Sequence, residues 1–175
     1  MKNLFFLILL LNVLCCCIKD SNSSNAQLPP ETQTGANTVG CLVNGKVFLP
    51  FAEGINAEVN CFYQLVGGKY YFTMAFSDLR GNSIETVNLF TANINLQLGQ
   101  TYTLNQKYTP VEGGGAEYYQ NLSNKFSTNN LQTGELKITK LDPSKSIISG
   151  TFWFDAVNAT GEKVEIRSGR FDWKY

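Results

Sequence analysis

Cysteine is the residue type in this sequence with the clearest potential for chemistry. The 175 residues include five cysteines and no histidine, so the commonest general base and the commonest metal ligand are both missing. Cys15, Cys16 and Cys17 are consecutive, whereas zinc-binding thiolates need spacers such as Cys-x-x-Cys so that the backbone can wrap the ion. The run therefore does not predict a metal site, and we expect no cofactor.

Carboxylates are the second group with catalytic potential. Asp155 could pair with Glu162 or Asp172 across a glycosidic bond, one carboxyl group acting as acid and the other as base or nucleophile. Their alternation with core-type residues is the ordinary pattern of a solvent-facing side of a strand. We therefore assign no catalytic residue, and we keep a hydrolase with paired carboxylates as an alternative function.

The N-terminus has the pattern of a secretory signal. Lys2 is followed by an apolar run from Leu4 to Leu11, extended by Val13 and Leu14. This run is too short for a helix across about 30 Å of hydrocarbon, which needs about 20 residues, but it suits the hydrophobic region of a signal peptide. We expect a cleaved leader over residues 1–16.

The end of the leader resembles the lipobox of bacterial lipoproteins, a Leu-x-x-Cys pattern in which the Cys thiol is acylated and the leader is cut just before it. Cys17 fits best, with Leu14 three positions earlier, while Cys16 has Val13 there. The resemblance implies a lipid anchor at Cys17. The following Lys19-Asp20 pair resembles the export signal of Bacteroidota lipoproteins, which implies an outer-membrane protein displayed at the cell surface; an ordinary polar tether is the alternative.

Residues 17–37 form the lipidated cysteine and a spacer, and residues 38–175 the folded domain. The spacer is rich in Ser, Asn, Thr, Gln and Pro and has little to bury, so we expect a flexible tether. Once the leader is cut and Cys17 is acylated, Cys41 and Cys61 remain. In an oxidising compartment such a pair predicts a disulfide, with two buried thiols as the alternative.

Composition excludes one class of partner. With 14 basic and 14 acidic side chains the surface is neutral and mixed, which offers no footprint for nucleic acid. We expect the protein to contact the membrane through its lipid anchor alone. A glycan, a peptide or a membrane-protein partner remains compatible with the charge.

The elements that position these groups are strands. Asn44-Gly45 predicts a hairpin turn between two β-prone runs, and Gly67-Gly68 predicts a second between alternating segments. Residues 83–94 change parity, which predicts a bulge, and so does Ser168-Gly169 near the end. No sustained helical period is present. We predict an all-β fold: a single antiparallel β-sandwich or flattened β-barrel of about eight to ten strands.

Two places could carry binding. Residues 108–130 break the strand pattern with Gly113-Gly114-Gly115, which predicts a long loop carrying Tyr118 and Tyr119; these either bind a partner or pack the loop onto the sheet. Trp153 lies on the predicted solvent face of its strand, suited to stacking on a sugar or docking a protein unless a second sheet or the loop covers it.

Two blocks of the chain resemble an uncharacterised family of Bacteroidota lipoproteins. They are LPPETQTGANTVGCLVNGKVFLP near the start and SGTFWFDAVNATGEKVEIRSGRFDWKY at the end. The family implies a lipoprotein and an all-β domain and brings no activity or site. We therefore expect an exported, membrane-anchored lipoprotein with a non-catalytic binding or structural role; the alternative is a cell-envelope hydrolase.

Overall fold

The structure, a computed structural model, describes residues 27–52, 58–80, 84–107 and 112–175. The predicted leader and Cys17 lie outside these residues. The described part contains eleven strands and no helix, so it has no helix that could cross a membrane. The strands are β1 (Thr38–Val43), β2 (Lys46–Phe48), β3 (Val59–Val66), β4 (Lys69–Asp78), β5 (Glu85–Ala92), β6 (Thr101–Gln106), β7 (Gly113–Asn121), β8 (Asn124–Ser127), β9 (Gly134–Asp142), β10 (Ile147–Val157) and β11 (Lys163–Lys174).

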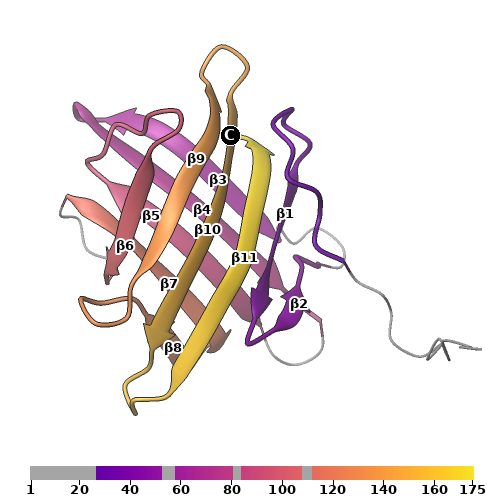
Figure 1. The fold of residues 1–175 in the computed structure, drawn as a ribbon, viewed down its shortest axis with the longest axis vertical. Coiled ribbons are helices and arrows are strands. Elements are labelled where there is room, and N and C mark those ends of the chain that lie inside the picture. Colours follow the sequence, from indigo (N-terminus) through magenta and orange to yellow (C-terminus); the bar gives the residue numbers. More distant parts are fainter. Residues whose placement is uncertain (1–26, 53–57, 81–83, 108–111) are drawn as a thin grey trace, which may run out of the picture.

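The strands form one sheet that curls into two facing layers. Their order is β2-β1-β11-β10-β9-β6-β7-β5-β4-β3, and all neighbours are antiparallel except β6 and β7. In Figure 1, β1, β11, β10, β9 and β6 form the near layer, and β3, β4, β5 and β7 cross behind them at an angle. The all-β prediction is confirmed; β2 and β8, of three and four residues, bring the strand number above the predicted range.

Two short connections draw the layers together. β8 pairs with both β7 and β10, so it links the back and front layers at one end. Phe51, just after β2, forms a parallel bridge with Asp78 at the end of β4. The sheet is therefore partly curled, intermediate between the predicted sandwich and barrel.

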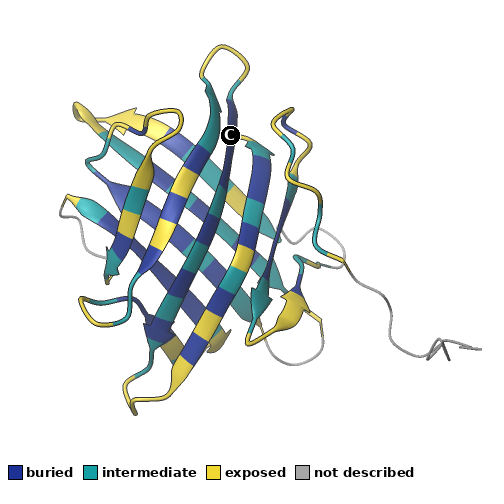
Figure 2. Ribbon diagram, viewed as in Figure 1, coloured by how far each residue is buried: buried dark blue, intermediate teal, exposed yellow. Residues whose placement is uncertain are grey.

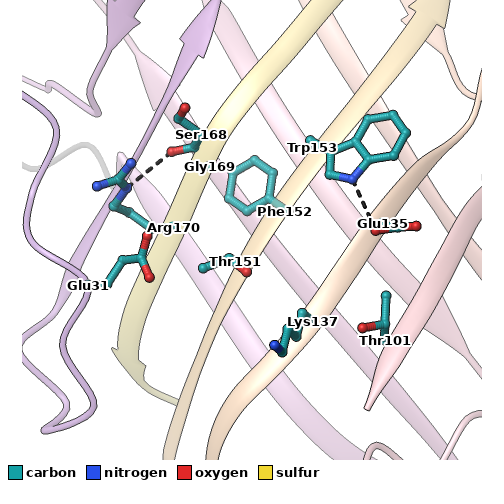
Figure 3. A pocket seen from close by; sticks show the side chains of 10 residues that line it. All are labelled: Glu31, Thr101, Glu135, Lys137, Thr151, Phe152, Trp153, Ser168, Gly169 and Arg170. Carbon is teal, nitrogen blue, oxygen red and sulfur yellow. Dashed lines mark hydrogen bonds between the residues drawn. The ribbon is translucent and has the colours of Figure 1, made fainter. Parts of the chain in front are cut away.

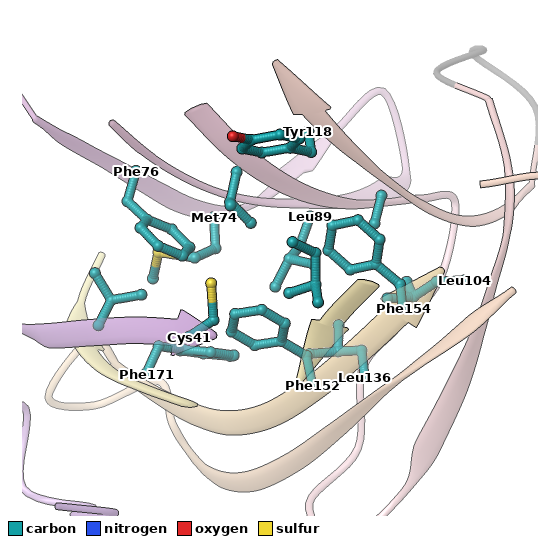
Figure 4. Packing of buried hydrophobic residues seen from close by; sticks show 14 of the residues in the cluster. Cys41, Met74, Phe76, Leu89, Leu104, Tyr118, Leu136, Phe152, Phe154 and Phe171 are labelled. Atoms are coloured by element: carbon teal, nitrogen blue, oxygen red, sulfur yellow. The ribbon is translucent and has the colours of Figure 1, made fainter. Parts of the chain in front are cut away.

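The core fills the space between the layers, because alternate residues of each strand point inward. Figure 2 shows this alternation along the front strands. Met74 and Phe76 of β4 face Leu136 of β9 and Phe152 of β10, among others (Figure 4), and all of them are buried. Apolar burial of this extent is the main stabilising contribution to the fold.

The two predicted hairpins are present. Asn44 and Gly45 both have positive φ, and so do Gly67 and Gly68, as a type I′ turn requires. The parity shift near the C-terminus is also a bulge. Phe152 pairs with Gly169 and Phe154 with Ile166, so the extra residue lies in β11, where Ser168 takes the positive φ.

The predicted loop over residues 108–130 is wrong in its greater part. Residues 108–111 lie outside the description, but Gly113 to Asn121 form β7, a central strand between β5 and β6. A Cβ at Gly115 would overlap the carbonyl oxygen of Gln106 and the ring of Phe90. The glycines are therefore needed for close strand packing and do not mark a turn.

The bulge predicted within residues 83–94 is also wrong. The register of β5 runs without a shift from Glu85 to Ala92 against both neighbours. The alternation of apolar residues along β5 breaks at Phe90, because this side chain is buried on the outer face, over the space that Gly115 leaves open. An apolar residue on the outer face, and no extra residue, explains the pattern.

Candidate functional site

Trp153 lies on the outer face of the front layer, opposite the C-terminal bulge. Trp153 lies on β10 between Phe152 and Phe154, which both point into the core, and it faces the bulged residues of β11. Since neighbouring strand residues point to opposite faces, the indole must point outward. Its exposure is intermediate, so part of the ring is open to solvent.

Side chains of the same face fix the indole. Its Nε1 donates to the Glu135 carboxylate at 3.2 Å, and the Arg167 guanidinium lies 5.5 Å from the ring centroid, within cation–π range. Arg167 also forms an ion pair with Asp155 at 2.5 Å. The expectation that a second sheet or the Tyr118 segment covers Trp153 is wrong, because the second layer lies on the other side of the sheet.

A groove of about 380 Å³ opens beside Trp153. We call it the Trp153 groove; Figure 3 shows its ten lining residues, which come from β6, β9, β10, β11 and the segment before β1. The residues are Glu31, Thr101, Glu135, Lys137, Thr151, Phe152, Trp153, Ser168, Gly169 and Arg170. Gly169 has no side chain, so the Phe152 ring packs in the core directly beneath the backbone of Gly169.

The groove carries charges of both signs. Glu31 and Arg170 lie to one side of Thr151, and Lys137 lies to the other, as Figure 3 shows. Within the described residues, none of these three charged side chains has an ion-pair partner within 4 Å. Their charges are therefore available to a ligand.

Asp172 brings the N-terminal segment to this face. Its carboxylate accepts hydrogen bonds from the hydroxyls of Thr32 and Ser149 and from the backbone N–H groups of Thr34, Gly35 and Ala36, at 2.7–3.1 Å. Burial alone would raise the pKa of Asp172, but these donors outweigh it and hold the pKa well below its usual range. The part of the predicted tether from Thr32 to Ala36 is thus bound to β11, which positions Glu31.

The predicted Cys41–Cys61 disulfide is not formed; both cysteines are free thiols. Cys41 lies on β1 in the front layer and Cys61 on β3 in the back layer. The two hairpins meet across the core, where the rings of Phe48 and Phe76 lie 5.6 Å apart, but their cysteines are not bonded. Burial raises the pKa of both thiols, to about 12 for Cys61. The alternative of two free thiols describes the structure, with Cys41 buried and Cys61 partly buried.

Tyr118 and Tyr119 point to opposite faces of β7. Tyr118 is in the core and donates to Glu85 at 2.6 Å; burial and this bond raise its pKa. Tyr119 donates to the buried Glu117 at 2.8 Å, and burial together with that bond raises its pKa to about 12. Both tyrosines pack the structure, as the alternative reading of the sequence had it, and neither reaches the Trp153 groove.

The three carboxylates suggested as catalytic partners are engaged separately. Asp155 pairs with Arg167, Glu162 accepts from Asn158 in the turn before β11, and Asp172 binds the N-terminal segment. In the described part of the chain, no group of three or more acidic or cysteine side chains could hold a metal ion.

Sequence reasoning found Trp153 but missed the rest of the groove. Glu135 and Lys137 were visible as the polar side of an alternating strand. What the sequence does not give is the order β11-β10-β9-β6, which aligns them with Arg170 and Thr101.

Comparison with known proteins identifies one family. A domain of unknown function, DUF6252, matches residues 79–172, more than half of the chain. The chain belongs to this family. The match covers Trp153, Glu135 and Asp172, and it confirms the predicted membership of a family without an assigned activity. No curated protein and no solved structure matches the chain.

Proposed function

We propose that this protein is an exported lipoprotein, anchored in the outer membrane through Cys17 and displayed at the cell surface, whose Trp153 groove binds a glycan. The observation that carries the binding role is an outward tryptophan, fixed by Glu135 and Arg167, beside a groove with unpaired charges. The anchor rests on the Leu14 to Cys17 pattern and the preceding apolar run.

The chemistry of the groove favours a sugar over a peptide. Peptides commonly bind by adding a strand to a free sheet edge, or by placing side chains in apolar pockets. The groove instead crosses β11, β10, β9 and β6, whose backbone groups already pair with each other. Recognition there must use side chains.

The lining side chains match sugar hydroxyl groups. A hydroxyl both donates and accepts, so it can pair with the carboxylate of Glu135, the ammonium of Lys137 and the hydroxyls of Thr101 and Thr151. The flat C–H face of a sugar ring can contact the indole of Trp153. An anionic substituent on the glycan could pair with Arg170, and a cationic one with Glu31.

Binding is better supported than hydrolysis. Glycosidases use two carboxyl groups on either side of the scissile bond, about 5 to 10 Å apart. Asp155, Glu162 and Asp172 have separate partners, and Asp172 is saturated with hydrogen bonds that hold the N-terminal segment. A non-catalytic role therefore stays the first choice.

The anchor and the groove are compatible in length. The fifteen residues from Cys17 to Glu31 can span at most about 54 Å when fully extended. Asp172 fixes the chain from Thr32 onward to β11. The tether would then hold the groove close to the membrane, facing glycans of the cell surface.

The binding role is tested on a glycan array followed by titration. We expect Trp153→Ala to weaken binding of the captured glycan about tenfold or more, a loss of about 1.4 kcal/mol. Trp173→Phe is the matched control, because Trp173 packs against the core and does not line the groove. Equal affinity of wild type and Trp153→Ala, or no glycan captured by the wild type, would reject the proposal.

The anchor is tested by metabolic labelling with a fatty-acid analogue. We expect Cys17→Ser to abolish labelling and Cys15→Ser to retain it. Loss of labelling in Cys16→Ser alone would move the anchor by one residue, and labelling of Cys17→Ser would exclude Cys17. Protease accessibility on whole cells then tests surface display.

A further inference from the structure

A second hollow lies at one end of the curled sheet, away from the Trp153 groove. It has a volume of about 400 Å³, within the range of small-molecule sites. Tyr63 of β3, Tyr70 of β4 and Tyr175 at the C-terminus line it, together with Asn95 and Leu141, among others. We call it the tyrosine notch. Figure 1 shows the C-terminus at this end, next to the turn between β9 and β10.

The three tyrosine rings form a fixed corner. Tyr63 and Tyr70 are stacked with centroids 5.2 Å apart, and Tyr175 meets Tyr63 edge-on at 5.9 Å and 83°. The Tyr63 hydroxyl donates to Asn95 Oδ1 and accepts the backbone N–H of Leu96, both at 3.0 Å. The corner is thus built before a ligand arrives, which lowers the entropy lost on binding.

Several polar groups of the notch remain available. Among the described residues, the hydroxyls of Tyr70 and Tyr175 and the amide Nδ2 of Asn95 have no hydrogen-bond partner. An apolar ring would leave these groups unpaired and desolvated, which costs about 1–3 kcal/mol for each group that becomes buried. A ligand that fits must therefore offer hydroxyl or carbonyl groups around its ring.

The notch also differs from the groove in charge. No Asp, Glu, Lys or Arg side chain lines it. An anionic ligand would lose its hydration without gaining a cationic partner among the lining side chains. An uncharged ligand meets no such penalty.

We propose that the tyrosine notch binds one uncharged sugar ring, as a free monosaccharide or as the terminal residue of a neutral glycan. The C–H face of the ring would contact the tyrosine corner, and its hydroxyls would pair with Tyr70, Tyr175 and Asn95. The site is separate from the Trp153 groove, so neither proposal depends on the other.

Saturation-transfer NMR and calorimetry on the full folded protein test this site. The probes are methyl glycosides of neutral hexoses and the corresponding neutral oligosaccharides, used at about 10 mM, ten times a millimolar dissociation constant. A uronic acid tests for charge, and phenol tests for a purely aromatic preference. Equal binding of the methyl glycoside and the oligosaccharide identifies a single-ring site, and preference for the oligosaccharide identifies a chain-end site.

We expect Tyr70→Ala and Tyr175→Ala each to weaken binding about tenfold or more, and Tyr70→Phe to weaken it less because the ring remains. Tyr71→Ala is the matched control, since Tyr71 is the next residue of β4 and points to the other face. Trp153→Ala should leave this binding unchanged, which separates the two sites.

Three results would overturn the proposal. They are no neutral sugar bound by the wild-type protein, unchanged affinity in folded Tyr70→Ala and Tyr175→Ala, or phenol or the uronic acid bound in preference to every neutral sugar. Folding of each variant is checked by its thermal transition. If both alanine variants unfold, the Tyr70→Phe variant decides.

Discussion

The Trp153 groove and the tyrosine notch are built by different parts of the same sheet. The groove lies across strand faces, where alternate side chains of both signs point into solvent. The notch lies at strand ends, where aromatic residues close the core and no charged side chain lines the hollow. A strand face thus offers charge and a broad contact, whereas the end of the curled sheet offers an uncharged aromatic corner.

The largest effect is expected from Asp172→Ala, which should disturb the groove and spare the notch. The substitution leaves several buried donors without an acceptor, and each hydrogen bond to a charged group contributes about 1.5–3 kcal/mol. We expect a loss of at least about 3 kcal/mol in the free energy of unfolding, measured in urea. Glu165→Ala, also on β11 with a side chain that is 65% exposed, is the control and should change stability by less than about 0.5 kcal/mol.

Groove binding should also weaken in Asp172→Ala. The N-terminal segment carries Glu31, and the hydrogen bonds of Thr32 and Thr34 to Asp172 hold it at the groove. Neutral sugar binding in the notch should stay unchanged wherever the variant is folded. Equal weakening at both sites would mean that the two regions are coupled.

The stability of the protein at acid pH should depend on the carboxylate of Asp172. The pKa of Asp172 in the folded state lies well below its unfolded value of about 3.9. Its contribution is therefore complete above about pH 4 and is lost as the pH falls toward the folded pKa, because the unfolded state takes up the proton first. We expect urea midpoints to fall between about pH 4 and pH 2 in the wild type, and to fall less in Asp172→Asn. Parallel profiles would contradict this role.

A smaller effect is expected from Gly169→Ala, which crowds the core beneath the groove. A Cβ there would overlap the ring of Phe152, which must then shift within the core and disturb the pairing of β10 with β11. Overpacking of this kind costs about 1–3 kcal/mol of stability. We expect a lower thermal midpoint and weaker groove binding, with the notch unaffected. An unchanged thermal midpoint would show that the Phe152 ring can shift freely.

The glycines also show where sequence reasoning succeeded and where it failed. Gly67 and Gly68 were assigned correctly because they lie between two alternating runs. Gly113 to Gly115 were assigned to a loop, although they form a central strand, because the sequence does not reveal that Gln106 and Phe90 approach the same backbone. Local patterns predict turns; close contacts between distant segments require the topology.

The candidate site was likewise predicted where local patterns decide and missed where the topology decides. The polar side of each strand, and with it Trp153, was readable from parity. The disulfide was predicted from an isolated pair of cysteines in an oxidising compartment, and the sequence does not reveal that Cys41 lies on β1 of the front layer and Cys61 on β3 of the back layer, where both thiols are free. The tyrosine notch was missed because it joins residues from β3, β4 and the C-terminus, whose meeting depends on the curl of the sheet.

Arg167→Ala tests how much the fixed indole matters to the groove. Arg167 lies over Trp153 and pairs with Asp155, but it is 37% exposed, so solvent screens both interactions. We expect a stability change of about 0.5–1 kcal/mol and a severalfold loss of groove affinity, measured by titration. Arg167→Lys should recover part of the affinity. Arg80→Ala, in an exposed ion pair elsewhere, is the control and should leave glycan binding unchanged.

The smallest effect is expected from thiol reagents, which should modify Cys41 and Cys61 hardly at all in the native protein. The pKa of Cys61 is raised to about 12 by burial, so the thiol is protonated and unreactive at pH 8. With Cys15, Cys16 and Cys17 replaced by serine, we expect alkylation of neither thiol in the native state and of both after denaturation without reductant. Cys61 also lies near the notch, since its thiol contributes to the raised pKa of Tyr175 after the larger effect of burial. If alkylation of the native protein occurs slowly, it should occur at Cys61, and a sugar bound in the notch should slow it. If no free thiol is found after denaturation without reductant, Cys41 and Cys61 form a disulfide after all.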